Sequence, residues 1–62
     1  MKILRNTITV PYYGIIVKGN GAQVDGNDCR VAATGIRVDG NNNTLTGNLG
    51  TVQNRGSGNV IR

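Results

Sequence analysis

The sequence predicts an all-β fold in which short strands are stacked in repeating coils. Three observations lead to this prediction: a fixed offset of 21 residues between equivalent positions, β-branched residues that alternate along short runs, and Gly-Asn clusters between those runs. At that offset, residues 14–27 align with residues 35–48, and seven of the fourteen positions are identical. A fixed period of this size is typical of stacked structural repeats.

Each repeat is expected to hold about three short strands. Ile15 and Val17 alternate with other residues, as do Ile36 and Val38 one repeat later. Period-two alternation of β-branched residues predicts half-buried strands, and Gly-Asn clusters predict turns. We therefore expect one domain over residues 1–62, a parallel β-solenoid of about three uncapped coils. Residues 14–34 and 35–55 form whole coils, and residues 1–13 and 56–62 form partial coils at the two ends.

The period arranges equivalent residues in columns along the solenoid. Asn6, Asn27 and Asn48 form one column at a bend, where each side-chain amide is expected to donate a hydrogen bond to the next. Glycine columns are expected where the backbone has positive φ. The predicted glycine columns are Gly14 with Gly35 and Gly56, and Gly19 with Gly40. The predicted apolar columns are Ile3 with Val24 and Leu45, Val10 with Val31 and Val52, Ile15 with Ile36, and Val17 with Val38.

The segments GIIVKGN (residues 14–20) and GIRVDGNNNTLTGN (residues 35–48) resemble right-handed parallel β-helix repeats. Such repeats occur in pectate-lyase-like enzymes, polysaccharide epimerases and phage tailspikes. The resemblance covers nearly the whole chain and is strongest over residues 14–48. It implies a right-handed solenoid, in line with the general preference for right-handed crossovers. We expect an extracellular or virion-associated location, although no signal peptide is visible.

The sequence shows no catalytic constellation, cofactor motif or metal site. The carboxylate cluster and the basic residue of the lyases have no counterparts, because the only acidic residues are Asp25, Asp28 and Asp39. Asp25 and Asp28 have a spacing that could hold a cation, but both are typical turn residues. Cys29 aligns with Ile8 and is expected to be a small core residue. We therefore expect a protein that is not an enzyme.

The charge pattern also limits the partners that we expect. The net charge is +4, but the basic residues are scattered and fall in different columns. Nucleic-acid modules usually combine a basic groove with stacking aromatic rings, so this class is not predicted. No apolar stretch approaches the roughly 20 residues that a membrane span requires.

The leading functional hypothesis is a structural subunit that stacks head to tail into a filament. Neither end looks capped, and bare strand edges favour pairing with another chain. Three 21-residue periods exceed the 62-residue chain by one, so a second copy is expected to continue the solenoid with one turn position skipped. In this alignment Arg62 falls in the column of Asn20 and Asn41. The residues expected at the assembly ends are Met1, Ile3, Val60, Ile61 and Arg62.

The alternative is a fragment of a larger protein, either a phage tailspike or a polysaccharide-binding or polysaccharide-processing β-helix protein. In that case an acidic glycan is expected to contact an outward face formed by Tyr12, Tyr13, Arg37 and Arg55. The starting Met and the length near three periods favour the complete subunit.

Overall fold

A computed structural model describes all 62 residues of the chain as an all-β fold with no helix. The strands are β1 (Lys2–Leu4), β2 (Tyr13–Val17), β3 (Gln23–Asp25), β4 (Thr34–Val38), β5 (Thr44–Thr46), β6 (Val52–Asn54) and β7 (Val60–Ile61). They form two sheets. The first sheet has the order β1-β3-β5-β7 and the second sheet has the order β2-β4-β6.

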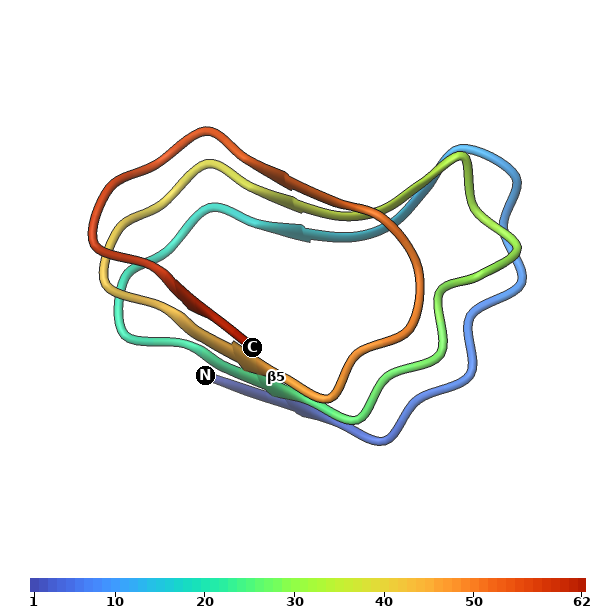
Figure 1. Ribbon diagram of the computed structural model, residues 1–62, viewed down its shortest axis with the longest axis horizontal. Coiled ribbons are helices and arrows are strands. Elements are labelled where there is room, and N and C mark those ends of the chain that lie inside the picture. Colours follow the sequence, from blue (N-terminus) through green and yellow to red (C-terminus); the bar gives the residue numbers. More distant parts are fainter.

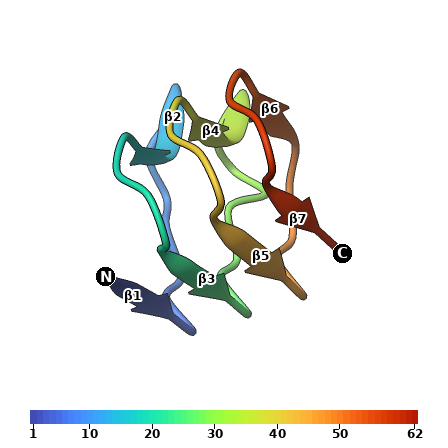
Figure 2. The same ribbon diagram turned by 90° about the vertical axis from the view of Figure 1, so that its left-hand side faces the viewer.

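The chain passes alternately through the two sheets, and we call one passage through both of them a coil. Figure 1 looks along the stack and shows the coils nested on one another, while Figure 2 shows the strands of each sheet side by side. Every strand pairs in parallel with the strand one coil further along. Parallel neighbours need a long crossover, and here the strand of the opposite sheet forms part of it. The predicted all-β class and parallel pairing are confirmed.

The core lies between the two sheets and is built from columns of aliphatic side chains. Val24 and Leu45 point inward from the first sheet, and Ile36 and Val38 point inward from the second, all at most 1% exposed. The strand neighbours of Val24 and Leu45 are more exposed, because successive side chains of a strand point to opposite faces. The structure places Ile3 opposite Val24, which in turn lies opposite Leu45.

The third coil is five residues shorter than the first two, and the sequence period did not predict this. Asn43 lies 21 residues after its partner Ala22, whereas Asn59 lies only 16 residues after Asn43. The difference arises at one corner, where the first two coils form a bulge over residues 9–13 and 30–34. Figure 1 shows this bulge in blue and green on the right, and the orange third coil cuts across its base.

The short coil overturns the predicted column of Val10, Val31 and Val52. Val52 pairs with Ile36, so it continues the Ile15 column of the second sheet. Val10 and Val31 lie on the bulge outside both sheets and are 43% and 61% exposed. Equal spacing in sequence therefore did not place these three valines in one column.

The glycine columns also differ from the prediction. Gly56 stacks on Gly40 and not on Gly35, again because the third coil is short. None of the five predicted glycines has positive φ. At Gly40 and Gly56 the reason for glycine is space, because a Cβ atom would overlap the carbonyl oxygen of the preceding coil. At Gly14 a Cβ would lie 2.6 Å from the carbonyl oxygen of Gly35. The glycines with positive φ are Gly21, Gly26, Gly47, Gly50 and Gly58.

Candidate assembly site at the two ends of the stack

Asn6, Asn27 and Asn48 form a hydrogen-bonded column at the bend that follows the first sheet. The Nδ2 of Asn6 donates to the Oδ1 of Asn27 at 3.1 Å, and the Nδ2 of Asn27 donates to the Oδ1 of Asn48 at 3.0 Å. The backbone N–H groups of Asn6 and Asn27 donate to the same two oxygens, at 2.9 Å and 3.0 Å. The column therefore has a direction, since each coil donates to the next.

This direction leaves different groups free at the two ends of the column. At the N-terminal end, the Oδ1 of Asn6 accepts no hydrogen bond within the chain. At the C-terminal end, the backbone N–H of Asn48 has no acceptor within the chain. One end of the molecule thus presents an acceptor and the other end presents a donor, in the same column.

A second asparagine column lies at the turn that leads into the first sheet. The backbone N–H of Ala22 donates to the Oδ1 of Asn43 at 2.8 Å, and the Nδ2 of Asn43 donates to the Oδ1 of Asn59 at 3.1 Å. Asn43 is fully buried. Sequence reasoning missed this column because Asn59 falls outside the 21-residue period. The shared pattern of residues 40–43 and 56–59, Gly-Asn-x-Asn and Gly-Ser-x-Asn, was the available signal.

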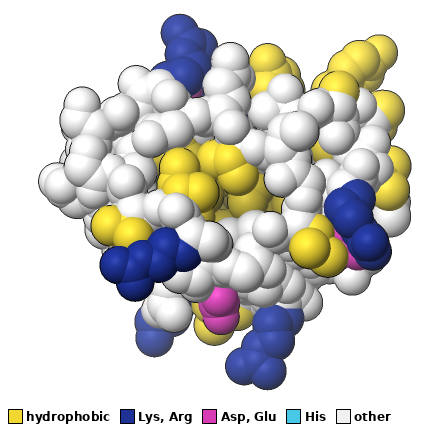
Figure 3. All heavy atoms as spheres, viewed as in Figure 1, with side chains coloured by type: hydrophobic (Ala, Val, Ile, Leu, Met, Phe, Trp, Pro, Cys, Tyr) yellow, Lys and Arg dark blue, Asp and Glu magenta, His cyan; other side chains and the backbone are white.

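Both ends of the stack leave the core partly open. Ile3 and Ile8 are only half-buried at the N-terminal end, as is Val52 at the C-terminal end. Val60 and Ile61 of β7 are 41% and 42% exposed. Figure 3 looks onto the C-terminal end and shows hydrophobic side chains in its centre, within a rim of white backbone and other side chains.

The predicted assembly residues lie at opposite ends of the first sheet. Met1 and Ile3 belong to its N-terminal edge, while β7 and Arg62 form its C-terminal edge (Figure 2). The backbone N–H of Arg62 donates to Leu45 at 2.9 Å, and its carbonyl oxygen accepts from Gly47 at 3.1 Å. Arg62 therefore aligns with the end of β5. The 21-residue period had predicted that it would align with Asn20 and Asn41, and that prediction was wrong.

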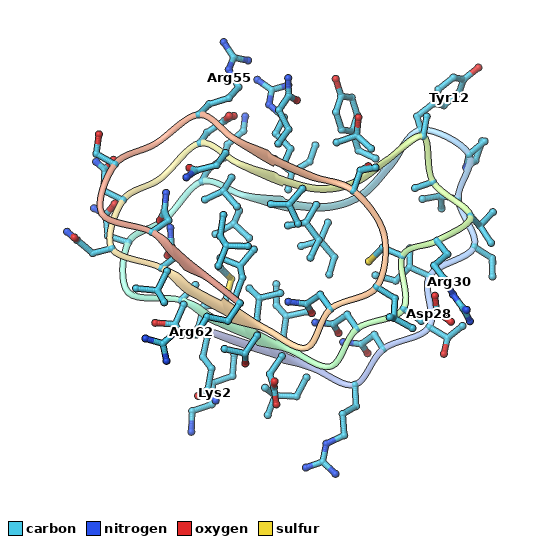
Figure 4. The ribbon with its side chains drawn as sticks, in the orientation of Figure 1. Lys2, Tyr12, Asp28, Arg30, Arg55 and Arg62 are labelled. Carbon is cyan, nitrogen blue, oxygen red and sulfur yellow. The ribbon has the colours of Figure 1, made fainter.

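The four residues of the glycan hypothesis lie in or next to the second sheet: Tyr13 in β2, Arg37 in β4, Tyr12 just before β2 and Arg55 just after β6. The guanidinium of Arg37 lies 5.7 Å from the ring centroid of Tyr13 and is paired with Asp39 at 3.0 Å. One face of Tyr13 is therefore covered, and the charge of Arg37 is partly compensated. Tyr12 is 76% exposed, and Figure 4 shows it far from Arg55 along the same side of the molecule. The structure does not bring the four side chains together.

The carboxylates considered as cation ligands each have a protein partner. Asp28 forms an ion pair with Arg30 at 2.9 Å, and the two side chains lie together in Figure 4. The hydrogen bonds from Arg30 lower the pKa of Asp28 below its usual value. Asp25 accepts a hydrogen bond of 2.6 Å from the hydroxyl of Thr46. The structure has no pocket and no group of three or more metal-ligating side chains.

Cys29 lies inside the core with no exposed surface. Burial raises the pKa of its thiol, and the nearby negative charge of Asp28 raises it further. The Cβ atom of Cys29 lies 3.2 Å from the positions where Cβ atoms of Gly14 and Gly35 would lie, and its sulfur lies 3.2 Å from the position at Gly14. Its surroundings are those of a small core side chain.

Comparison with known proteins identifies no relative of this chain. No family matches the chain, and no curated protein or solved structure matches it significantly. No helix of sufficient length and apolar character to cross a membrane is present.

Proposed function

We propose that this chain is a structural subunit, a right-handed parallel β-solenoid whose copies stack end to end into a filament. The path of the chain supports the handedness. Figure 2 places the C-terminal end on the side that faces the viewer in Figure 1, and in Figure 1 the chain advances towards that side anticlockwise. This is the hand adopted by about 98% of parallel crossovers.

The observation that carries the proposal is the complementarity of the two open ends. The column of Asn6, Asn27 and Asn48 has the free Oδ1 of Asn6 at its N-terminal end and the free backbone N–H of Asn48 at its C-terminal end. In a stack, Asn48 donates to Asn6 of the next copy in the same way as Asn27 donates to Asn48. The open edge of β6 receives β2 of the next copy, which extends the second sheet across the junction.

Stacking by translation does not close on itself, so it generates a filament and not a ring. The half-buried core side chains at each end become covered, and the unpaired backbone groups of the edge strands gain partners. Each copy contributes three strand spacings to the filament, which gives an axial repeat of about 14 Å.

Gly19 provides independent support. A Cβ at Gly40 or Gly56 would overlap a carbonyl oxygen of the preceding coil, whereas a Cβ at Gly19 meets nothing within 4 Å. The isolated chain therefore has no steric need for glycine at this position. In the filament, Gly19 lies against Gly56 of the copy whose C-terminal end receives this chain. Gly40 lies against Gly19 in the same way within one chain. Only glycine fits at such a contact.

The test is the substitution Gly19→Ala, studied by electron microscopy and by sedimentation over a range of protein concentrations. The parent chain is expected to form thin fibres above a threshold concentration. Gly19→Ala is expected to keep the circular dichroism spectrum and thermal midpoint of the monomer but to form no fibres. Gln23→Ala, an exposed change in β3, which is not an edge strand, is the matched control and should assemble normally.

A parent chain that stays monomeric at every concentration would contradict the proposal. Retention by immobilised acidic polysaccharide, lost on Tyr12→Ala or Arg55→Ala, would then favour the glycan-contacting alternative. Normal fibres from Gly19→Ala would exclude in-register stacking as the mode of assembly.

A further inference from the structure

We propose that residues 59–62 occupy the place that residues 1–4 of the next copy take in the filament. The C-terminal end of each chain therefore has to be displaced before the next copy stacks in register. This inference rests on the proposed filament, and it identifies which segment controls the joining of two copies.

The unequal size of the two sheets leads to this inference. The first sheet has four strands and the second has three. If β1 of a second copy paired with β7, its β2 would be separated from β6 by a vacant strand position, and Asn48 would be two coils away from the next Asn6. If β1 instead takes the place of β7, both sheets and the asparagine column continue without a gap.

The register shows that the two segments compete for the same positions. Lys2 is equivalent to Gln23 and to Thr44, and Thr44 pairs with Val60. Lys2 of the incoming copy therefore takes the place of Val60. By the same relation, Ile3 of the incoming copy takes the place of Ile61.

The displacement exchanges the backbone hydrogen bonds of β7 for an equal set, at the cost of the two hydrogen bonds that Asn43 donates to the Oδ1 of Asn59. Val60 donates to the carbonyl oxygen of Asn43, and Arg62 donates to that of Leu45, both at 2.9 Å. The N–H of Gly47 donates to Arg62 at 3.1 Å. An incoming β1 can make the equivalent bonds, since it would lie on β5 in the same way as β5 lies on β3 within one chain.

The incoming copy also makes contacts that β7 cannot make. It brings β2 onto the open edge of β6, and it brings Asn6 onto Asn48. Against this, β7 is tethered to its site, which gives it an effective concentration on the order of millimolar. The chain's own end therefore protects the first sheet at low protein concentration, and another copy replaces it at high concentration.

A disulfide that fixes β7 in place tests the displacement. Thr44 and Val60 are paired and exposed, and neighbouring strands bring paired Cα atoms to about 4.8 Å, within the range that a disulfide spans. The variant carries Thr44→Cys and Val60→Cys, with Cys29→Ala to remove the native thiol. The matched control carries Gln23→Cys and Thr44→Cys with Cys29→Ala, which links β3 to β5 and leaves β7 free.

In oxidising buffer, the variant with β7 fixed is expected to form no fibres under conditions in which the control assembles. Addition of dithiothreitol is expected to restore assembly in the same sample. Fibres that form at equal rates from both oxidised proteins would overturn the inference. If both oxidised proteins and the parent chain form fibres, the displacement of β7 would be wrong but the proposed filament would still stand.

A shortened chain provides a second test that does not depend on the disulfide. Removal of residues 60–62 eliminates most of the competitor, so the threshold concentration for assembly is expected to fall roughly tenfold, which corresponds to about 1.4 kcal/mol. A threshold that is unchanged or higher would overturn the inference. A parent chain without fibres under any condition would instead refute the proposed function.

Discussion

Asn27 and Asn43 are the two fully buried polar side chains of the molecule, and hydrogen bonds satisfy both of them. Asn27 accepts from Asn6 and donates to Asn48 and to the carbonyl oxygen of Ile3. An apolar side chain cannot replace such a group without leaving partners unpaired on both sides. At the residue scale, these two amides therefore help to fix the stacking of the coils alongside the aliphatic core.

The first prediction is that Asn27→Ala lowers the free energy of unfolding by about 3 kcal/mol, because several buried partners lose their hydrogen bonds. Urea denaturation followed by circular dichroism provides the measurement. Asn20→Ala is the matched control, since Asn20 accepts only one exposed hydrogen bond, from Asn41, and it is expected to cost less than about 1 kcal/mol. Equal losses in the two variants would show that burial of the asparagine column does not contribute as described.

At the scale of elements, the short third coil depends on one tight connection between Leu49 and Val52. Gly50 has a φ of 113°, which L-residues rarely adopt, and a Cβ there would lie 2.8 Å from the carbonyl oxygen of Cys29. The connection therefore requires glycine for both its backbone conformation and its close approach to the second coil.

The prediction for this connection is that Gly50→Ala destabilises the fold by more than about 2 kcal/mol, through backbone strain and displacement of β6. The matched control is Gly47→Ala. Gly47 has a φ of 63°, and a Cβ there would meet only ordinary van der Waals contacts, the nearest being the Oδ1 of Asp25 at 3.7 Å. Only the usual cost of about 1 kcal/mol for the left-handed conformation is therefore expected. Denaturant midpoints of the two variants distinguish these cases. A Gly50→Ala protein as stable as the control would contradict this account of the short coil.

The sequence was sufficient to predict the first two coils, because their residues repeat at one spacing and alternate in the same way. It was not sufficient for the third coil. Val52 continues the 21-residue spacing of Val10 and Val31, yet its strand pairs 16 residues back with Ile36. The competing signal was the Gly-Ser-x-Asn pattern at residues 56–59, which matches residues 40–43.

The candidate assembly site was predicted only in part. Open strand edges at both ends followed from the absence of any recognisable cap. The unequal number of strands in the two sheets followed only from the structure, because it depends on the loss of five residues in one loop. The steric role of the glycines also followed only from the structure, since spacing in sequence does not distinguish a positive φ from a lack of room for a Cβ atom.

At the scale of the whole molecule, the net charge of +4 opposes the association of identical copies. Figure 4 shows Lys2 and Arg62 projecting on the same side, from the two ends of the first sheet. Stacking therefore brings Lys2 of one copy towards the end of its neighbour that carries Arg62. Neither residue forms an ion pair within the chain.

The last prediction follows from this repulsion. Raising the ionic strength from about 0.01 M to about 0.15 M shortens the Debye length from about 30 Å to about 8 Å, so the threshold concentration for fibres is expected to fall. Sedimentation of fibres across a salt series measures the threshold. Lys2→Gln removes one of the approaching charges, so it is expected to lower the threshold at low salt and to weaken the salt dependence. A threshold that rises with salt would mean that attraction between opposite charges holds the copies together, and the end-on approach of these two cations would then be wrong.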